Sequence, residues 1–406
     1  MTSARERQGP LDGLRVVDMS GMISGAFATT MLGDFGADVV MIEHPEVGDP
    51  IREWPLKTED GTSLSWKSLG RNKRCITLDL GDEQGRDLAL DLVRDADVAF
   101  ENFRPGTMER WGLGPDDLHE VNPGLVYVRL SGYGQTGPKS EKPGFGTIAE
   151  GISGWAHANG FPDREPLLPP VSLADLTAAQ FALQATLMAL FERDVGRGGS
   201  GEGQVVDVSL IEPLWRLFFG DVEAYGRTGH VRERTGNRHP STAPRNIYET
   251  ADGHMTMSAS NQKIFERVAR AIDKPELIED PRFADNASRV EHVEPLDAAI
   301  EEWTRRHTTE EAIEILEAHD AIVGPVYDMA DIFEDEQFRA RGDLLEVEDP
   351  DVGTTTTFAP VPKFSRTPGD VEFLGPRHGE HNVEVYVGEL GLSPEELAEL
   401  EEAGVV

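Results

Sequence analysis

The feature that most constrains the fold is a strand–helix–strand pattern that recurs over residues 14–134. Residues 14–18 (LRVVD) and 37–43 (ADVVMIE) have the apolar, β-branched character of short buried strands. Between them, residues 26–36 carry apolar side chains on one helical face and end at Gly36. A unit of this kind, about 30 residues long, joins two parallel strands. The opening segment therefore predicts the start of a parallel sheet.

Two more units follow the first. Residues 75–80 (CITLDL) and 97–102 (DVAFEN) predict strands, residues 81–96 predict the helix between them, and residues 124–134 predict another strand with its turn. Strands and helices that alternate in this way form an open α/β domain. We therefore predict an α/β fold for the first half of the chain.

The pattern changes in the second half. Residues 173–193 predict a long helix with an apolar stripe, and residues 205–212 a strand that runs into a helix. The polar segment 226–246 suits a linker or an active-site loop, and residues 248–260 predict a hairpin that turns at Asp252-Gly253. Helical patterns then cover residues 262–273, 295–306 and 308–319.

These patterns divide the chain into three parts. We predict the first part of a large domain over residues 1–220, and a linker with a small α+β domain over residues 221–324. Strand-like pieces and an acidic terminal helix then return over residues 325–406 to complete the large domain.

Acidic residues dominate the charge of the chain. It has 74 Asp and Glu residues against 38 Lys and Arg residues, a formal net charge of −36. Such a surface repels phosphate backbones and anionic lipids, so we expect neither nucleic acid nor membrane as a partner. The charge is spread along a chain with recurrent apolar segments, which favours a folded protein adapted to high salt, of the haloarchaeal type. An ordinary acidic cytosolic protein is the alternative.

Other signals concern location and redox chemistry. The polar start MTSARERQGP lacks the apolar stretch of a secretory signal, and we expect no apolar run near the roughly 20 residues that a membrane span needs. Cys75 is the single cysteine, which permits neither an internal disulfide nor a thiolate metal cluster. We therefore expect a cytoplasmic protein.

Two glycine-bearing loops fail the tests for nucleotide binding. The loop GMISG at residues 21–25 lacks the G-x-G-x-x-G spacing, which disfavours a dehydrogenase. The loop GRGGSGEG at residues 196–203 has no Gly-Lys-Ser/Thr and is not a Walker A loop. We also expect no metal site, because no His-Glu-x-x-His or comparable spacing occurs.

Asp175, in PPVSLADLTAAQ, has two interpretations. Its position near the start of the long helix is that of an N-cap, whose carboxylate accepts from the first free N–H groups. The same position suits an anionic nucleophile, because a helix N-terminus stabilises the charged form at neutral pH. The spacing alone does not separate the two roles.

Seven segments occur in a fixed order along the chain: PLDGLRVVDMS, MLGDFGADVVMIEHPEVGD, RNKRCITLDL, ADVAFENFRPGTMERWGLG, NPGLVYVRLSGYGQTGP, VSLADLTAAQ and GEGQVVDVSL. Together they closely resemble the class III CoA-transferases, the family of formyl-CoA transferase and the carnitine dehydratase-like proteins. The resemblance covers nearly the whole chain. It implies a large Rossmann-like domain built from the N- and C-terminal segments, a small α+β domain, and a homodimer of interlocked rings.

The resemblance also implies a site. The catalytic aspartate of the family matches Asp175. The positions that contact coenzyme A match Ile23, Ser24, His44, Leu78, Gly81, Asn102, Phe103, Arg110 and Lys142. Cationic side chains among them, with Arg71 or Lys73, can neutralise the CoA phosphates, and Leu78 and Phe103 can wall the adenine or pantetheine group. CoA thioesters are the implied substrates, with no permanently bound cofactor.

The chain departs from the formyl-CoA transferase branch at several positions. That branch has His and Gln where Gly21 and Ile23 stand here, which argues against oxalate or formate as substrate. Its glycine run over the active site has no clear match. The candidate equivalent is the loop 236–241, with Asn237, Arg238 and His239 as substrate residues.

Salt-adapted members of the family are expected to use succinyl-CoA with a C4–C5 dicarboxylate such as mesaconate or citramalate, and we predict mesaconate. A dicarboxylate needs a second cationic clamp, for which the candidates are Arg52, Arg238, His239 and Arg245. The implied mechanism passes through an anhydride and a CoA thioester on Asp175.

Two other functions compete with this prediction. An α-methylacyl-CoA racemase needs an acid–base pair around Cα. That branch places a His shortly after the GYGQTGP stretch, and residues 143–146 (PGFG) contain none. A non-catalytic acyl-CoA-binding protein is the second alternative.

Overall fold

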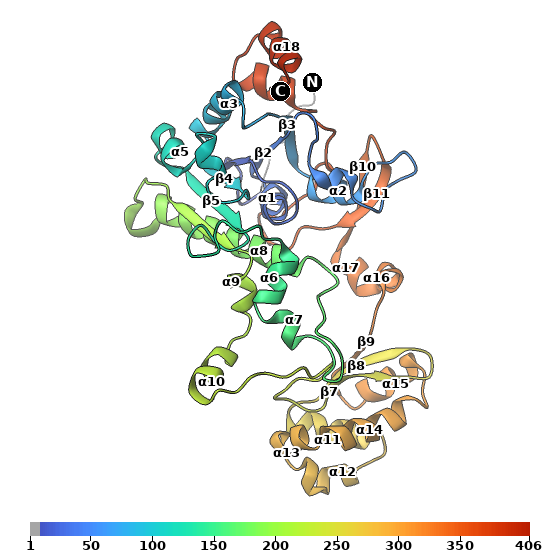
Figure 1. Ribbon diagram of the computed structural model, residues 1–406. Coiled ribbons are helices and arrows are strands. Elements are labelled where there is room, and N and C mark those ends of the chain that lie inside the picture. The colour runs from blue at the N-terminus through green and yellow to red at the C-terminus, as the bar shows by residue number, and fades with distance from the viewer. Residues whose placement is uncertain (1–8) are drawn as a thin grey trace. The chain divides into compact units, whose positions relative to one another are not determined.

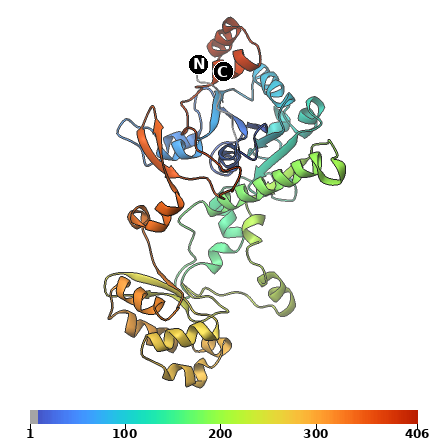
Figure 2. The same ribbon diagram turned by 180° about the vertical axis from the view of Figure 1, so that it is seen from behind.

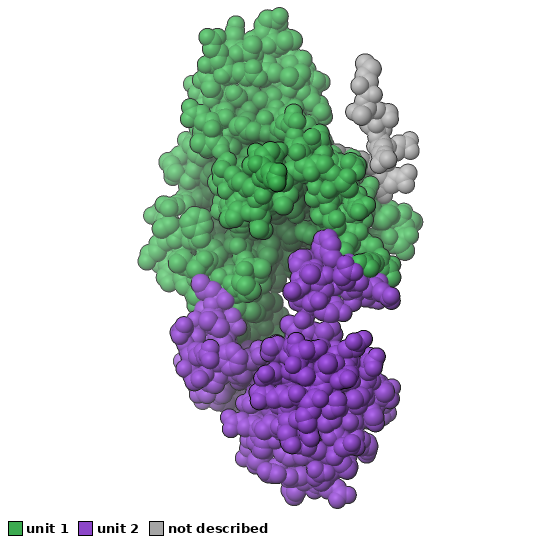
Figure 3. Space-filling view, turned by 90° about the vertical axis from the view of Figure 1, so that its right-hand side faces the viewer, with its two compact units in different colours: residues 1–155, 169–222, 338–406 green, residues 156–168, 223–337 purple. Residues whose placement is uncertain are grey.

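The structure is a computed structural model that describes residues 9–406. Residues 1–8, which make up most of the polar N-terminal segment MTSARERQGP, lie outside the described part. The chain divides into two compact units, which Figure 3 colours separately. The first contains residues 9–155, 169–222 and 338–406, and the second contains residues 156–168 and 223–337.

The first unit contains a parallel sheet of six strands in the order β3-β2-β1-β4-β5-β6 (Figure 1). Its strands are β1 (Arg15–Asp18), β2 (Asp38–Glu43), β3 (Lys73–Thr77), β4 (Val98–Glu101), β5 (Val126–Ser131) and β6 (Val205–Ser209). This is the strand order of a Rossmann-type sheet, so the order reverses between β1 and β4. The prediction of a parallel α/β fold is confirmed.

Helices and turns connect these strands and continue the first unit. They are α1 (Ser24–Asp34), η1 (Pro50–Glu53), α2 (Leu64–Leu69), α3 (Glu83–Arg94), α4 (Thr107–Arg110), α5 (Pro115–Val121), α6 (Gly146–Ile152), α8 (Leu173–Asp194), η2 (Gly196–Gly198), α9 (Glu212–Trp215), η4 (Val383–Glu389) and α18 (Pro394–Ala403). A hairpin of β10 (Leu344–Asp349) and β11 (Gly353–Phe358) belongs to the returning segment. Three helices span the unit boundaries: α7 (Trp155–Ala158), α10 (Asp221–Thr228) and α17 (Glu336–Arg341).

Apolar side chains on both faces of the sheet explain why it is covered twice. One face packs with α1 and α8 around Val39, Val98 and Val128. The other packs with α3, α5 and the C-terminal helices around Val40, Ala99 and similar residues. Strands buried on both faces carry apolar residues at consecutive positions, as residues 16–17 and 39–42 do here. Figures 1 and 2 show α8 running beside β5 and β6.

The expectation that no long apolar run exists is wrong for α8. This helix has 22 residues, and an 18-residue window in it reaches a mean hydropathy of 1.3, enough by length and composition to cross a membrane. In the fold, 44% of that window is buried against the rest of the chain. A core helix that packs on a sheet passes the same test, because its inward face is made of Ala and Leu.

The second unit is a small α+β structure. The hairpin of β7 (Arg245–Glu249) and β8 (His254–Ser258) turns at residues 250–253 as predicted, and β9 (Val323–Pro325) pairs with β8. Around it lie α11 (Gln262–Ala271), α12 (Glu276–Glu279), η3 (Pro281–Phe283), α13 (Asn286–Glu291), α14 (Val293–Thr304), α15 (Thr309–Glu317) and α16 (Met329–Glu334). Its own apolar cluster includes Phe265, Leu296 and Trp303.

The unit boundaries differ from the predicted ones in two places. Residues 156–168 join the second unit, although they lie within the predicted first part. The chain returns to the first unit at Phe338, not at residue 325. Both shifts arise where short helices and loops carry no strong periodicity for the sequence to show.

Candidate active site

A pocket of about 310 Å³ lies at the carboxyl ends of the central strands of the first unit. Residues after β1, β2, β4 and β5 contribute to it, together with the first turns of α1 and α8. This edge of a doubly wound sheet, next to the switch in strand order, is where such folds bind ligands. The lining includes Met19, Ser20, Gly21, Met22, Ile23, Ser24, Glu43, His44, Asp49, Asn102, Phe103, Ser131, Gly132, Gly144, Phe145 and Asp175.

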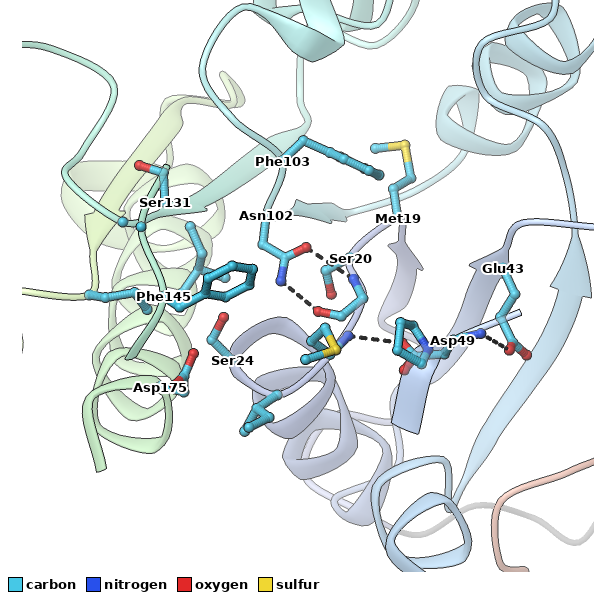
Figure 4. Close-up of a pocket in the computed structure, with 18 of the residues that line it drawn as sticks. Met19, Ser20, Ser24, Glu43, Asp49, Asn102, Phe103, Ser131, Phe145 and Asp175 are labelled. Atoms are coloured by element: carbon cyan, nitrogen blue, oxygen red, sulfur yellow. Dashed lines mark hydrogen bonds between the residues drawn. The ribbon is translucent and has the colours of Figure 1, made fainter. Parts of the chain in front are cut away.

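The loop before α1 is held from two sides. The Asn102 side chain accepts a hydrogen bond from the Gly21 amide at 3.0 Å and donates to the Gly21 carbonyl at 2.6 Å. On the other side, Asp49 Oδ2 accepts from the Met22 amide at 2.9 Å. Met22 has φ of 65°, a left-handed conformation that a non-glycine residue adopts only when its surroundings impose it. Figure 4 draws these bonds as dashed lines.

Asp49 belongs to a buried charged network. Burial raises the pKa of the Asp49 carboxyl, while backbone hydrogen bonds from Ile51 and Met22 lower it in part. Glu43 accepts from the Asp49 amide at 2.9 Å and pairs with Arg52 at 2.6 Å. The Arg52 guanidinium also stacks over the Trp66 ring at 3.7 Å. Arg52 is therefore committed to this network.

Asp175 stands in the first turn of α8, on the opposite side of the pocket (Figure 4). The N-cap of the helix is Ser172, so the N-cap interpretation of Asp175 is wrong by three residues. Burial is the main cause that raises the pKa of Asp175 to about 6, and the charge of Glu150 adds to it. The carboxyl is therefore mostly ionised at neutral pH, although the site makes ionisation harder than the helix N-terminus alone predicts.

Three glycines of the pocket wall stand where a side chain would not fit, and one of them, Gly146, faces the Asp175 carboxylate. A Cβ atom at Gly146 would come 2.0 Å from Asp175 Oδ2. Gly132 and Gly144 pack with their backbones in contact, and a Cβ atom at either would lie within 3 Å of the other's Cα. Any side chain at these positions would displace the pocket wall, so glycine is required by space.

On the pocket side of Asp175 lie one small and one aromatic side chain, those of Ser24 and Phe145. Figure 4 shows Ser24, Phe145 and Asp175 together on one side of the pocket, with Glu43 and Asp49 on the other. Ser24 is 4% exposed, whereas Phe145 is 68% exposed. Phe145 and the acidic residues Glu43, Asp49 and Glu150 were missed in the sequence. The Gly-Phe-Gly of residues 144–146 is a local signal for Phe145, and no local pattern marks the three carboxylates.

The structure brings some of the predicted coenzyme A residues together and not others. Ile23, Ser24, His44, Asn102 and Phe103 line the pocket with Asp175. The remaining predicted positions lie elsewhere on the first unit: Leu78 is 1% exposed within the core, Gly81 donates to Asp79 in a turn, Arg110 is exposed and donates to Gly106 and Thr107, and Lys142 is exposed.

Leu78 and Gly81 lie against the pair of aromatic rings formed by Phe103 and Trp111. The Phe103 and Trp111 rings meet edge to face at 5.0 Å, and both pack on the cluster that contains Leu78. Because Leu78 is covered, it acts through this pair of rings and presents almost no surface of its own.

Two cations considered for the CoA phosphates are unavailable. Arg71 is buried in an ion pair with Asp34 at 2.6 Å, and Lys73, which is fully buried, lies 3.4 Å from Asp18. Both hold the α1 segment on the sheet, so their assignment to phosphate is wrong. The sequence could not reveal this, because Arg71 and Asp34 are 37 residues apart.

The predicted substrate loop belongs to the second unit. Arg238 pairs there with Asp297 at 2.7 Å, and Asp297 also accepts from Tyr248 and Asn246. The His239 ring accepts from the Ser241 amide at 3.3 Å, and Asn237 lies in the same turn. Arg245 is the first residue of β7 and is exposed. Their role at the substrate stays a prediction.

Within residues 9–406, no three His, Cys, Asp or Glu side chains are grouped so that they could hold a metal ion. Cys75 is completely buried, and burial raises the pKa of its thiol, which leaves it neutral.

Known proteins resemble this chain both in sequence and in structure. The sequence pattern of CoA-transferase family III matches residues 11–382. The chain is 42% identical to succinyl-CoA–D-citramalate CoA-transferase of Chloroflexus aurantiacus over the full length of both chains. It is 38% identical to the beta subunit of succinyl-CoA–L-malate CoA-transferase of the same organism, over 98% of each. The crystal structure of a CAIB/BAIF family protein from Brucella suis matches with a TM-score of 0.82 and 32% identity, over 94% of this chain and 99% of that one.

Proposed function

Because the chain belongs to CoA-transferase family III, we propose that it moves coenzyme A from succinyl-CoA to a C4–C5 dicarboxylate, with mesaconate or citramalate as the acceptor. The observation that carries the proposal is the half-buried Asp175 carboxylate in a pocket at the ligand-binding edge of the sheet. The two relatives named above support succinyl-CoA as donor and a short dicarboxylate as acceptor.

The first half of the reaction transfers the acyl group to the protein. An oxygen of Asp175 attacks the thioester carbonyl of succinyl-CoA, and the carbon–sulfur bond breaks to give a mixed anhydride and CoA thiolate. The thiolate then attacks the Asp175 carbonyl carbon and releases succinate, which leaves an aspartyl-CoA thioester. A carboxylate nucleophile conserves the energy of the thioester, whereas water would release it.

The second half runs in reverse with the acceptor. A carboxylate oxygen of the acceptor attacks the aspartyl thioester and expels CoA thiolate, which forms an acceptor–aspartyl anhydride. The thiolate then attacks the acceptor carbonyl carbon, so that acceptor-CoA leaves and Asp175 is a free carboxylate again. The first turn of α1 has no side-chain cap, and its backbone N–H groups at Ser24 and Gly25 stabilise the oxyanion of each tetrahedral intermediate.

Coenzyme A is bound by the predicted residues that line the pocket and by predicted residues outside it. Ile23, Ser24, His44 and Phe103 contact the pantetheine arm in the pocket. The exposed cations Arg110 and Lys142 bind the phosphates, since exposed guanidinium and ammonium groups are available to an incoming anion.

A homodimer of interlocked rings is part of the same proposal. It is supported by large apolar side chains that the first unit leaves exposed, among them Met188 at 68%, Phe191 at 61% and Phe219 at 84%. Exposed apolar groups of this size on neighbouring elements are typical of subunit interfaces. Light scattering on the purified protein in molar KCl tests it, and a monomeric mass at all concentrations contradicts it.

The direct test of function uses succinyl-CoA with a panel of mesaconate, citramalate, malate and glutarate in molar KCl. New CoA thioesters are identified by mass spectrometry, and hydroxylamine trapping followed by peptide mapping locates the covalent adduct. We expect mesaconyl-CoA or citramalyl-CoA and a hydroxamate at Asp175. Loss of transfer in Asp175→Asn and Asp175→Ala, with activity kept in the surface variant Glu192→Gln, supports the assignment. Active Asp175 variants would refute it. Deuterium exchange at Cα in the same reactions tests the racemase alternative.

A further inference from the structure

A second buried carboxylate lies beside the first turn of α8. Glu150 belongs to α6 and is 3% exposed. Its Oε1 atom accepts a hydrogen bond from the Ala174 amide at 3.4 Å. Ala174 directly precedes Asp175, in a turn where Ser172 provides no side-chain cap. The carboxylate of one helix therefore satisfies a free amide at the start of another.

Glu150 also acts on Asp175 through its charge. After burial, the negative charge of Glu150 is the next cause that raises the pKa of Asp175. A carboxylate charge close to another carboxyl in a partly desolvated site disfavours the ionised form of that carboxyl, here Asp175. Acylation removes the charge of Asp175, so this repulsion is absent from the anhydride and from the thioester.

We propose that Glu150 is a positioning residue that anchors the first turn of α8 and favours the acylated forms of Asp175 over its free carboxylate. The inference rests on the proposed function, because it assumes that Asp175 carries the acyl group. The repulsion raises the energy of one state only, the free carboxylate from which both covalent intermediates are formed. Glu150 does not itself line the pocket, so it acts through Asp175.

Other charged groups around Asp175 are engaged elsewhere. Ser24 of α1 is uncharged. Other elements line the pocket or pack against α8, and their charged side chains have partners of their own. The pairs are Glu43 with Arg52, His44 with the Glu46 amide, Asp49 with the amides of Met22 and Ile51, Arg129 with Glu101 and Glu109, Asp207 with the Gln135 amide, and Glu212 with Ser209. Among residues 9–406, Glu150 is the charged side chain that raises the pKa of Asp175.

The test replaces Glu150 by Gln, which removes the charge and keeps an acceptor oxygen for the Ala174 amide. The acid limb of kcat/KM, expected near pH 6 in the unaltered enzyme, moves to lower pH. The ratio of acylated to free Asp175 on mixing with succinyl-CoA, measured by intact mass after acid quench, falls by about tenfold for each pH unit that the limb moves. The KM for succinyl-CoA is unchanged. Glu192→Gln, an exposed carboxylate at the other end of α8, removes the same charge and leaves both readouts unaltered.

The outcomes separate this inference from the proposed function. A folded Glu150→Gln enzyme with an unshifted limb and normal acylation overturns the role of Glu150 and leaves Asp175 as the nucleophile. If the unaltered enzyme forms no adduct at Asp175, the proposed function itself fails. Should Glu150→Gln not fold, Glu150→Asp keeps the charge on a shorter side chain and retains the limb near pH 6. If the folded Glu150→Asp enzyme has its acid limb of kcat/KM at the pH of an ordinary carboxyl, the inference is overturned.

Discussion

Asp175→Asn is expected to stabilise the fold while it abolishes transfer. The pKa of the Asp175 carboxyl rises from 3.8 in an ordinary environment to about 6 in the fold. An acid whose pKa is raised on folding ionises more readily when unfolded, so its ionisation favours the unfolded chain. Asn has nearly the same shape as Asp and carries no charge, so the variant escapes this cost.

The size of the effect follows from the two pKa values. Each pKa unit corresponds to about 1.4 kcal/mol, so the ionised carboxylate lowers the free energy of unfolding by about 3 kcal/mol above both pKa values. Because the side chain is partly exposed to solvent, we expect a gain of about 2 to 3 kcal/mol for Asp175→Asn near pH 8. The gain falls to about half near pH 5, between the pKa values of the unfolded and folded states, and disappears below the pKa of the unfolded state.

Urea unfolding in molar KCl measures this difference. Midpoints and slopes for the unaltered protein, Asp175→Asn and the control Glu192→Gln are compared near pH 8 and near pH 5. A variant that is less stable than the parent near pH 8 refutes the electrostatic reasoning. A gain that is equal at both pH values also refutes it, because a packing effect would not follow the titration of Asp175.

Four further perturbations test other parts of the site. Gly146→Ala places a Cβ atom 2.0 Å from Asp175 Oδ2 in the present geometry, so we expect loss of transfer in a folded protein; an active variant would show that the α6 turn gives way. Asn102→Ala removes both side-chain bonds to Gly21, and unfolding free energy should fall by about 1 to 3 kcal/mol with a raised KM for succinyl-CoA; an unchanged KM contradicts the role of this loop. Arg110→Ala should raise the KM for succinyl-CoA by about tenfold and leave kcat intact, since its guanidinium is assigned to a phosphate; equal loss of kcat would place it in the chemistry instead. The net charge of −36 predicts that unfolding free energy rises from dilute buffer to molar KCl as self-repulsion is screened, and a flat or falling dependence argues against salt adaptation.

The fold was largely predictable because its signals are local. A buried parallel strand such as Asp38–Glu43 contains a run of consecutive apolar residues at 39–42, and a core helix such as Leu173–Asp194 has apolar side chains at helical spacing. Both patterns are visible without knowledge of what they contact. Boundaries were less well predicted, and Asp175 moved from the N-cap to the third helical position, because Ser172 and Asp175 are both acceptable caps in sequence.

The partners of the charged residues were not predictable. Arg52, Arg71 and Lys73 have the same appearance in the sequence as the exposed Arg110 and Lys142. Only the fold shows that the first three are held by Glu43, Asp34 and Asp18. Since a charge is available to a ligand only when no nearby opposite charge binds it, the sequence alone does not separate the engaged cations from the exposed ones.

The sequence by itself determined the parallel α/β sheet and the family, because both depend on residue type and order along the chain, and it marked Asp175 as the candidate nucleophile. The tertiary structure decided what surrounds that aspartate. Glu150 and Gly146 reach it through the packing of α6 on α8, and Asn102 and Asp49 reach the opposing loop from separate strand ends. The reactivity of a carboxylate depends on its burial and on the charges near it, and both arise only when distant segments meet.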